Sequence, residues 1–145
     1  MKLLAVTALG LALMNAPVFA AGDVAAGETG FRKCKACHAI TDAEGTKIVK
    51  GGRTGADLYG IYKRVAGSTD FKYGDSMVQA GEAGLIWEED AFVSYVSDPK
   101  KFLVEHNDDK RAKSKMSFKL KKPEDAANIW AYLVSVGPAA PAEAN

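Results

Sequence analysis

Apolar and polar residues alternate with a helical period in several separate stretches of the chain. Residues 23–36 are predicted to form a first helix, and residues 75–81 a short second one. The acidic segment 88–90 predicts the start of a third helix, because carboxylates in a first turn face the positive end of the helix dipole. An apolar stripe that includes Phe92 and Val96 continues this helix.

Two later helices are marked by a proline at the first helical position, where the missing N–H of proline is not needed. Asp98 supplies an N-cap acid before Pro99, and together they predict a short helix through Leu103. Pro123 opens the last helix, which Gly137 ends. The apolar face of this last helix consists of Ala126, Ile129, Trp130 and Leu133.

The remaining stretches of the chain lack a sustained period. Residues 41–60 are rich in glycine, lysine and aspartate, and residues 105–117 are strongly charged, so both are predicted to be loops. No repeat and no strand pattern is apparent in the sequence. The expected architecture is therefore an all-α domain of about five helices joined by long loops.

The N-terminus has the pattern of a secretory signal peptide. Lys2 and the mostly apolar run 3–16 precede a series of small residues, which predicts a signal over residues 1–20 with cleavage after Ala20 or Ala21. A membrane anchor is the alternative interpretation. The shortness of the apolar run and the cleavage-like site favour the signal peptide, and hence export to the periplasm.

Removal of this signal would leave one domain with no net charge. We expect the domain over residues 21–137 and a disordered tail over residues 138–145. Lys2 is the only charge of the signal, so 18 of the 19 basic residues remain against 18 acidic ones. This balance argues against a nucleic-acid partner, which would favour a strongly basic chain.

Cysteine and histidine occur together in the run Cys34-Lys35-Ala36-Cys37-His38. C-x-x-C-H is the attachment signature of c-type haem, in which each thiol forms a thioether with a haem vinyl group. Two intervening residues let one helical turn span both vinyl positions, and the adjacent histidine then ligates the iron. The sequence therefore predicts one covalently bound haem c on Cys34 and Cys37, with His38 as an axial ligand.

Three other uses of this cysteine pair compete with haem attachment. A thioredoxin-like dithiol needs a βαβ context, which the surrounding helix and loop pattern does not offer. A structural zinc site needs four ligands, and His106 is the only other histidine. A simple disulfide loop would leave His38 without a role.

The sixth position of the iron decides between electron transfer and reactive chemistry. Met77, Met116 and His106 are the candidates in the mature chain. Met77 lies in a short helical stretch and is expected to pack in the core, whereas His106 stands among polar and acidic residues typical of a surface. Met116 lies in a polar loop, which favours it as the ligand, although a loop methionine tucked against the core would look the same.

Taken together, these residues resemble the class I c-type cytochromes, in particular the bacterial cytochrome c2 group, which is related to mitochondrial cytochrome c. The resemblance extends from Gly22 to Val136, and residues 54–60 (TGADLYG) match the family segment T-G-P-N-L-x-G. It implies the cytochrome c fold, with about five helices and long loops wrapped around one covalent haem. It also implies contact between the first and last helices through Gly27, Phe31, Ile129 and Tyr132.

The same resemblance implies roles for residues around the haem. Arg64, Tyr73 and Trp87 match residues near the haem propionates, and Tyr95 matches a tyrosine beside the methionine sulfur. Met116 matches the axial methionine. Methionine as the sixth ligand implies electron transfer, because a thioether favours ferrous iron and fills the last coordination position.

Several positions depart from the family pattern. Ala56 stands where the family has a proline whose carbonyl accepts the second N–H of the proximal histidine. The carbonyl survives this change, so we expect the hydrogen bond to persist, with less rigidity than proline would give. Asp57 replaces a neighbouring asparagine, and residues 41–50 and 105–113 are longer than in the mitochondrial protein.

Seven basic residues and no acidic residue lie between Lys110 and Lys122, on both sides of Met116. Such clustering is typical of a surface that steers an acidic partner, although a solvated loop is the alternative. The lysines expected to form this docking surface are Lys113, Lys115, Lys119, Lys121 and Lys122.

The predicted function is a periplasmic electron carrier of photosynthesis or respiration that acts as a monomer and is not an enzyme. The resemblance implies transient complexes at the membrane surface, with a cytochrome bc complex as electron donor. A photosynthetic reaction centre or a cytochrome oxidase would be the acceptor, and the sequence does not distinguish them. The alternative function is a haem enzyme or gas-binding protein with a labile methionine ligand, and a subunit of a larger complex is a third interpretation.

Overall fold

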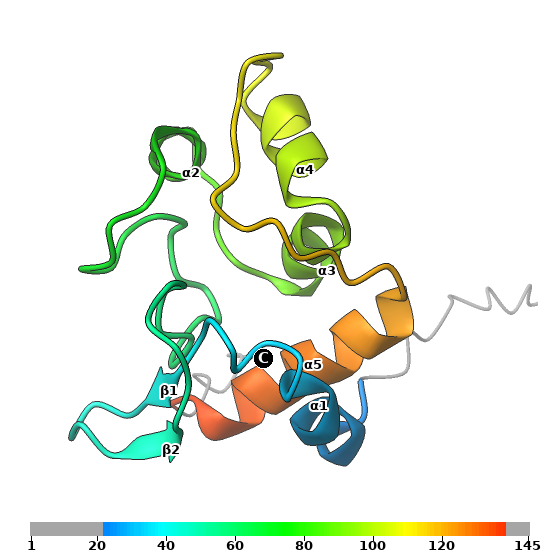
Figure 1. Cartoon of the computed structure of the whole chain (residues 1–145). Coiled ribbons are helices and arrows are strands. Elements are labelled where there is room, and N and C mark those ends of the chain that lie inside the picture. Colours follow the sequence, from blue (N-terminus) through cyan, green and yellow to red (C-terminus); the bar gives the residue numbers. More distant parts are fainter. Residues whose placement is uncertain (1–21, 139–145) are drawn as a thin grey trace, which may run out of the picture.

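A computed structural model describes residues 22–138 of the chain, and five helices dominate it (Figure 1). The elements in chain order are α1 (Val24–Phe31), β1 (Ile40–Thr41), β2 (Lys47–Val49), α2 (Asp75–Glu82), α3 (Glu89–Ser97), α4 (Pro99–His106) and α5 (Pro123–Val136). The predicted signal peptide and all of the predicted tail except Pro138 lie outside the described residues. Within those residues, no helix combines the length and apolar character needed to cross a membrane.

Helices α1 and α5 cross closely at the base of the fold (Figure 1). Gly27 makes this approach possible, since a Cβ atom there would lie only 1.9 Å from the backbone oxygen of Asn128. Beside it, the rings of Phe31 and Tyr132 meet with centroids 5.8 Å apart. The predicted contact between the first and last helices is thus confirmed.

The core continues from α5 to α3 and α4. Phe92 of α3 packs its ring against Trp130 of α5, with centroids 5.3 Å apart. Val96 and Leu103 are buried beside them. Asp98 separates α3 from α4 and caps α4 by accepting a hydrogen bond from the Lys101 backbone N–H at 3.1 Å. The predicted start of this helix at Pro99 is confirmed.

The prediction that the chain contains no strands was wrong, because residues 40–49 form a small antiparallel hairpin. Its strands contain two and three residues, too few to display an alternating pattern in the sequence. The Asp42 side chain closes the turn by accepting hydrogen bonds from the backbone N–H groups of Glu44 and Thr46. Ile40 is fully buried and anchors the hairpin to the core.

Two helix ends also differ from the prediction. Helix α1 stops at Phe31 rather than at residue 36. Tighter turns follow it, with the N–H of Cys34 bonded to the carbonyl of Phe31 at 2.8 Å. Helix α4 continues to His106, beyond the expected start of the loop at residue 105. Helix ends shift because side-chain caps and packing decide them more than apolar period does.

Replacing Gly27 by alanine is predicted to destabilise the fold by roughly 3 kcal/mol, at the upper end of the usual cost of overpacking. The added methyl would meet the rigid backbone of Asn128, which cannot move without shifting α5. Urea unfolding of the haem-loaded protein measures the effect. Thr29→Ala at an exposed position of the same helix is the control, and equal stability of the two variants would contradict the close crossing.

Candidate haem site

A cavity of about 250 Å³ opens into the centre of the fold. Protein interiors are normally close-packed, with few voids larger than a single water molecule, so a space of this size with a mostly apolar lining is suited to an apolar group. All eight residues singled out from the sequence line it: Cys34, Cys37, His38, Arg64, Tyr73, Trp87, Tyr95 and Met116.

The C-x-x-C-H segment forms a turn at the edge of this cavity. The backbone N–H groups of Cys37 and His38 both bond to the carbonyl of Cys34, at 3.1 and 3.0 Å. This turn directs both thiols and the imidazole toward the same cavity. Cys34 is half-buried and Cys37 exposed, and neither takes part in a disulfide.

The orientation of the His38 ring is determined by two neighbours. Its Nδ1 lies 2.7 Å from the carbonyl oxygen of Ala56. Because a carbonyl only accepts, Nδ1 carries the proton, which leaves Nε2 free to ligate a metal. Gly55 leaves room for the ring, since a Cβ atom there would lie 2.4 Å from Cε1 of His38. The expected persistence of the bond to Ala56 is confirmed.

Burial raises the pKa of the Cys34 thiol to about 11, although Lys33 opposes this rise. A dithiol that acts by exchange needs an accessible thiolate, so a strongly protonated Cys34 does not suit that chemistry. Zinc needs four ligands. Across residues 22–138, no group of three or more His, Cys, Asp or Glu side chains is arranged so that it could hold a metal ion.

Arg64 and Tyr73 are held by polar contacts beside the cavity. The Arg64 guanidinium donates to the backbone carbonyls of Tyr59 at 2.8 Å and of Asp57 at 3.2 Å. Burial lowers the pKa of Arg64, with Tyr73 and Asp57 acting in the opposite direction. The Tyr73 hydroxyl lies 2.7 Å from the hydroxyl of Thr69, a partner that no sequence pattern indicated.

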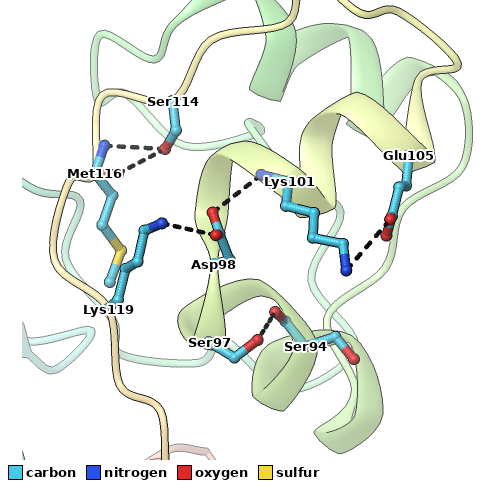
Figure 2. A network of polar contacts seen from close by, with 8 residues as sticks. All are labelled: Ser94, Ser97, Asp98, Lys101, Glu105, Ser114, Met116 and Lys119. Atoms are coloured by element: carbon cyan, nitrogen blue, oxygen red, sulfur yellow. Dashed lines mark hydrogen bonds and ion pairs between the residues drawn. The ribbon is translucent and has the colours of Figure 1, made fainter.

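Tyr95 and Met116 meet through Ser114, which sequence reasoning also missed. The Ser114 hydroxyl accepts from the Met116 backbone N–H at 3.1 Å and donates to its carbonyl at 2.9 Å (Figure 2). The Tyr95 hydroxyl lies 3.5 Å from the Ser114 hydroxyl oxygen. Burial raises the pKa of Tyr95, and the rings of Trp87 and Phe102 contact its ring edge to face. Ser114 thus fixes the backbone that carries Met116.

The three candidate sixth ligands occupy different environments. Met77 and Met116 both line the cavity, whereas His106 does not. His106 is exposed and its ring stacks on that of Phe102, with an interplanar angle of 6°. Met77 is 8% exposed and packs in the core, as predicted. The thioether of Met116 reaches the cavity from an irregular segment instead of a helix.

Basic side chains lie at the cavity and along the segment that follows Met116. Lys33, Lys113 and Lys115 belong to the cavity lining, together with Phe118, which is 42% exposed. The Lys115 ammonium also donates to the backbone carbonyl of Lys72 at 2.7 Å. Lys121 and Lys122 are exposed but do not line the cavity.

Asp98 connects the segment that follows Met116 to the start of α4 (Figure 2). Its carboxylate caps the helix through the Lys101 N–H and forms an ion pair with Lys119 at 2.7 Å. These two contacts lower the pKa of Asp98, the hydrogen bond from Lys119 most of all. Lys119, expected from the sequence to be a docking residue, therefore also anchors its own segment.

The fold and the site define a class of protein. The cavity offers two thiols and an imidazole on one turn, a thioether on a separate segment and a largely apolar lining. This donor set fits a covalently attached haem with nitrogen and sulfur axial ligands. The molecule has the architecture of a c-type cytochrome.

Comparisons with known proteins identify the family. No protein-family model matches the chain. It is 55% identical to cytochrome c-551 of Roseobacter denitrificans, over 88% of this chain and 91% of that protein. It is 52% identical to cytochrome c2 of Cereibacter sphaeroides, over 79% and 95% of the two chains.

Solved structures agree with these relatives. The cytochrome c2 structure from Rhodobacter sphaeroides superposes with a TM-score of 0.78 at 52% identity, over 80% of this chain and 97% of that one. The cytochrome c2 structure from Paracoccus denitrificans gives 0.77 at 46% identity, over 82% and 99%. The chain belongs to the cytochrome c2 family of c-type cytochromes, electron carriers that contain covalently bound haem c.

Asp98→Asn is predicted to destabilise the protein at pH 7 but not in acid. Asparagine keeps the helix cap and removes the charge that pairs with Lys119. Because the folded pKa of Asp98 lies below its ordinary value of 3.8, its ionic contribution is complete above that value. It disappears as the pH falls through the folded pKa.

Urea unfolding of both proteins from pH 7 down to pH values below the folded pKa provides the measurement. Asp70→Asn is the control, at an exposed position that forms no ion pair within residues 22–138. A stability difference between wild type and Asp98→Asn that is unchanged across this range would refute the ion-pair account.

Proposed function

We propose that this chain is a periplasmic single-electron carrier in which Cys34 and Cys37 bind one haem c through thioethers. His38 and Met116 are its axial ligands. The observation that carries this proposal is the site of His38: its Nδ1 is engaged by Ala56 at 2.7 Å, and its ring shares a cavity with Met116. An imidazole with a free Nε2 and a thioether together form the ligand pair of electron-transfer cytochromes.

The side chains around the cavity suit electron transfer. The haem supplies a reversible single-electron iron couple when it is bound. Ala56 orients His38, and Ser114 holds the backbone of Met116, so contacts within the protein chain position both ligands. The apolar lining excludes water and disfavours the additional charge of ferric iron, which raises the reduction potential.

The composition of the lining also weighs against an enzyme with a labile methionine. Among the described residues that line the cavity, His38 is the only histidine and there is no carboxylate. Histidine and carboxylate side chains are common general acids and bases, and the one histidine of the lining is assigned here to the iron. The carrier is therefore the function that the site supports best.

The lysines near the cavity support an acidic docking partner. Lys113 and Lys115 line the cavity, and so does Lys33 from the N-terminal part of the chain. The exposed Phe118 adds an apolar contact. Charges arranged in this way steer association and allow rapid release. We propose a cytochrome bc complex as donor and a reaction centre or cytochrome oxidase as acceptor, each bound transiently by a monomer.

Replacing Met116 by alanine is predicted to remove the weak long-wavelength absorption band of methionine bound to ferric haem. It is also predicted to open the reduced iron to carbon monoxide, whereas the wild type is expected not to bind carbon monoxide. Met77→Leu is the matched control, because it alters the other methionine of the cavity and keeps its volume. Retention of the band in Met116→Ala, or its loss only in Met77→Leu, would overturn the assignment.

Charge reversal at Lys113 is predicted to slow electron transfer from a purified cytochrome bc complex at low salt. The second-order rate of the wild type is expected to fall roughly tenfold or more as salt rises, because steering is screened. Lys47→Glu on strand β2 makes the same charge change away from the cavity lining. Equal rates for the two variants, or a rate independent of salt, would contradict docking at the cavity.

A further inference from the structure

Residues 107–120, here called the Met116 segment, connect α4 to the residues before α5 without any helix or strand of their own. Figure 1 shows the segment running back past α2 and α3. Its position therefore depends on contacts with other elements. At its far end, the Leu120 N–H bonds to the Val96 carbonyl at 2.8 Å, and Lys119 pairs with Asp98.

The near end of the Met116 segment is held by α2, with its shortest contacts at Ser76. The Ser76 hydroxyl accepts a hydrogen bond from the Lys113 backbone N–H at 3.0 Å. The Ser76 backbone carbonyl accepts a second one from the Asn107 side-chain amide at 2.8 Å. Ser76 thus binds the segment both where it leaves α4 and three residues before Met116.

The side-chain amide of Asn107 is further evidence that the contact with α2 holds this end of the segment. Its Oδ1 is buried and has no hydrogen-bond partner within residues 22–138. An unsatisfied buried carbonyl is unfavourable, but the opposite amide orientation would place this oxygen against the Ser76 carbonyl. The Ser76 carbonyl, together with Gln79 Oε1 at 3.5 Å from the same Asn107 nitrogen, therefore determines how the Asn107 amide is oriented.

The Lys113 anchor limits how far Met116 can withdraw from the cavity. Three residues of extended chain span at most about 11 Å, so a fixed Lys113 keeps the Met116 backbone within that distance of its anchor. Ser114 shortens this reach further, because its hydroxyl forms hydrogen bonds with both the N–H and the carbonyl of Met116. Loss of the Ser76 hydroxyl would free the Lys113 end while leaving Ser114 intact.

We propose that Ser76 is a positioning residue for Met116: it fixes the Met116 segment against α2 and so keeps the thioether at the iron. This inference rests on the axial role of Met116 proposed above. Ser76 contributes a hydrogen bond to the segment and is absent from the cavity lining, so it acts through Lys113.

Imidazole binding to the ferric holoprotein tests the proposal, because imidazole must displace Met116 to reach the iron. Ser76→Ala is predicted to tighten imidazole binding about fivefold, which corresponds to one hydrogen bond of about 1 kcal/mol at 1.4 kcal/mol per factor of ten. Ser76→Thr keeps the hydroxyl and should restore the wild-type affinity. Ser97→Ala is the matched control, since among residues 22–138 the Ser97 hydroxyl bonds only to the Ser94 carbonyl of its own helix (Figure 2).

Amide hydrogen exchange at Lys113, measured by NMR, separates this proposal from the ligand assignment. Faster Lys113 exchange in Ser76→Ala, with unchanged exchange in Ser97→Ala, would support the anchor even if the wild type lacked the methionine band. Absence of that band would count against the axial role of Met116 alone. Imidazole affinity and Lys113 exchange that are both unchanged in Ser76→Ala and in Ser76→Val would overturn the positioning role.

Discussion

The hydrogen bond from His38 to the Ala56 carbonyl is the contact on which the candidate site depends most. It links the cysteine turn to residues 54–60, and it determines which imidazole nitrogen faces the cavity. Gly55 makes the approach possible, since any side chain there would occupy the space of the His38 ring. The bond uses a backbone carbonyl, which explains how alanine can stand where the family pattern has proline.

The two sides of the site are built in different ways. His38 lies on a short turn that follows α1, and α1 is locked against α5 by the close approach at Gly27. Met116 lies on a segment without regular structure, and Ser76, Ser114 and Asp98 hold that segment at separate points. We therefore expect the histidine side to be rigid and the methionine side to depend on individual hydrogen bonds.

The five helices could be predicted from the sequence because their signals are local. The eight site residues named from the sequence all line the cavity, but four of them (Arg64, Tyr73, Trp87 and Tyr95) were named only through the family resemblance. Pro99 and Pro123 mark helix starts, and the C-x-x-C-H spacing is itself a chemical requirement. Ser76, Thr69 and Ser114 were missed, since a serine or threonine hydroxyl finds its partner only after folding. The hairpin at Ile40 was missed because two short strands carry no period, and the tertiary contacts of α1 and α4 moved their ends.

The central claim is that Met116 completes the iron coordination opened by His38. Proton–carbon NMR of the reduced holoprotein, labelled at the methionine methyl groups, tests it most directly. The methyl group of a methionine that ligates the iron lies over the haem ring. The ring current of the haem then moves its resonance far outside the usual methionine range. The account predicts one such shifted resonance, present in wild type and in Met77→Leu and absent in Met116→Ala. Methionine methyls that all remain in the usual range, or a shifted resonance that disappears with Met77, would contradict it.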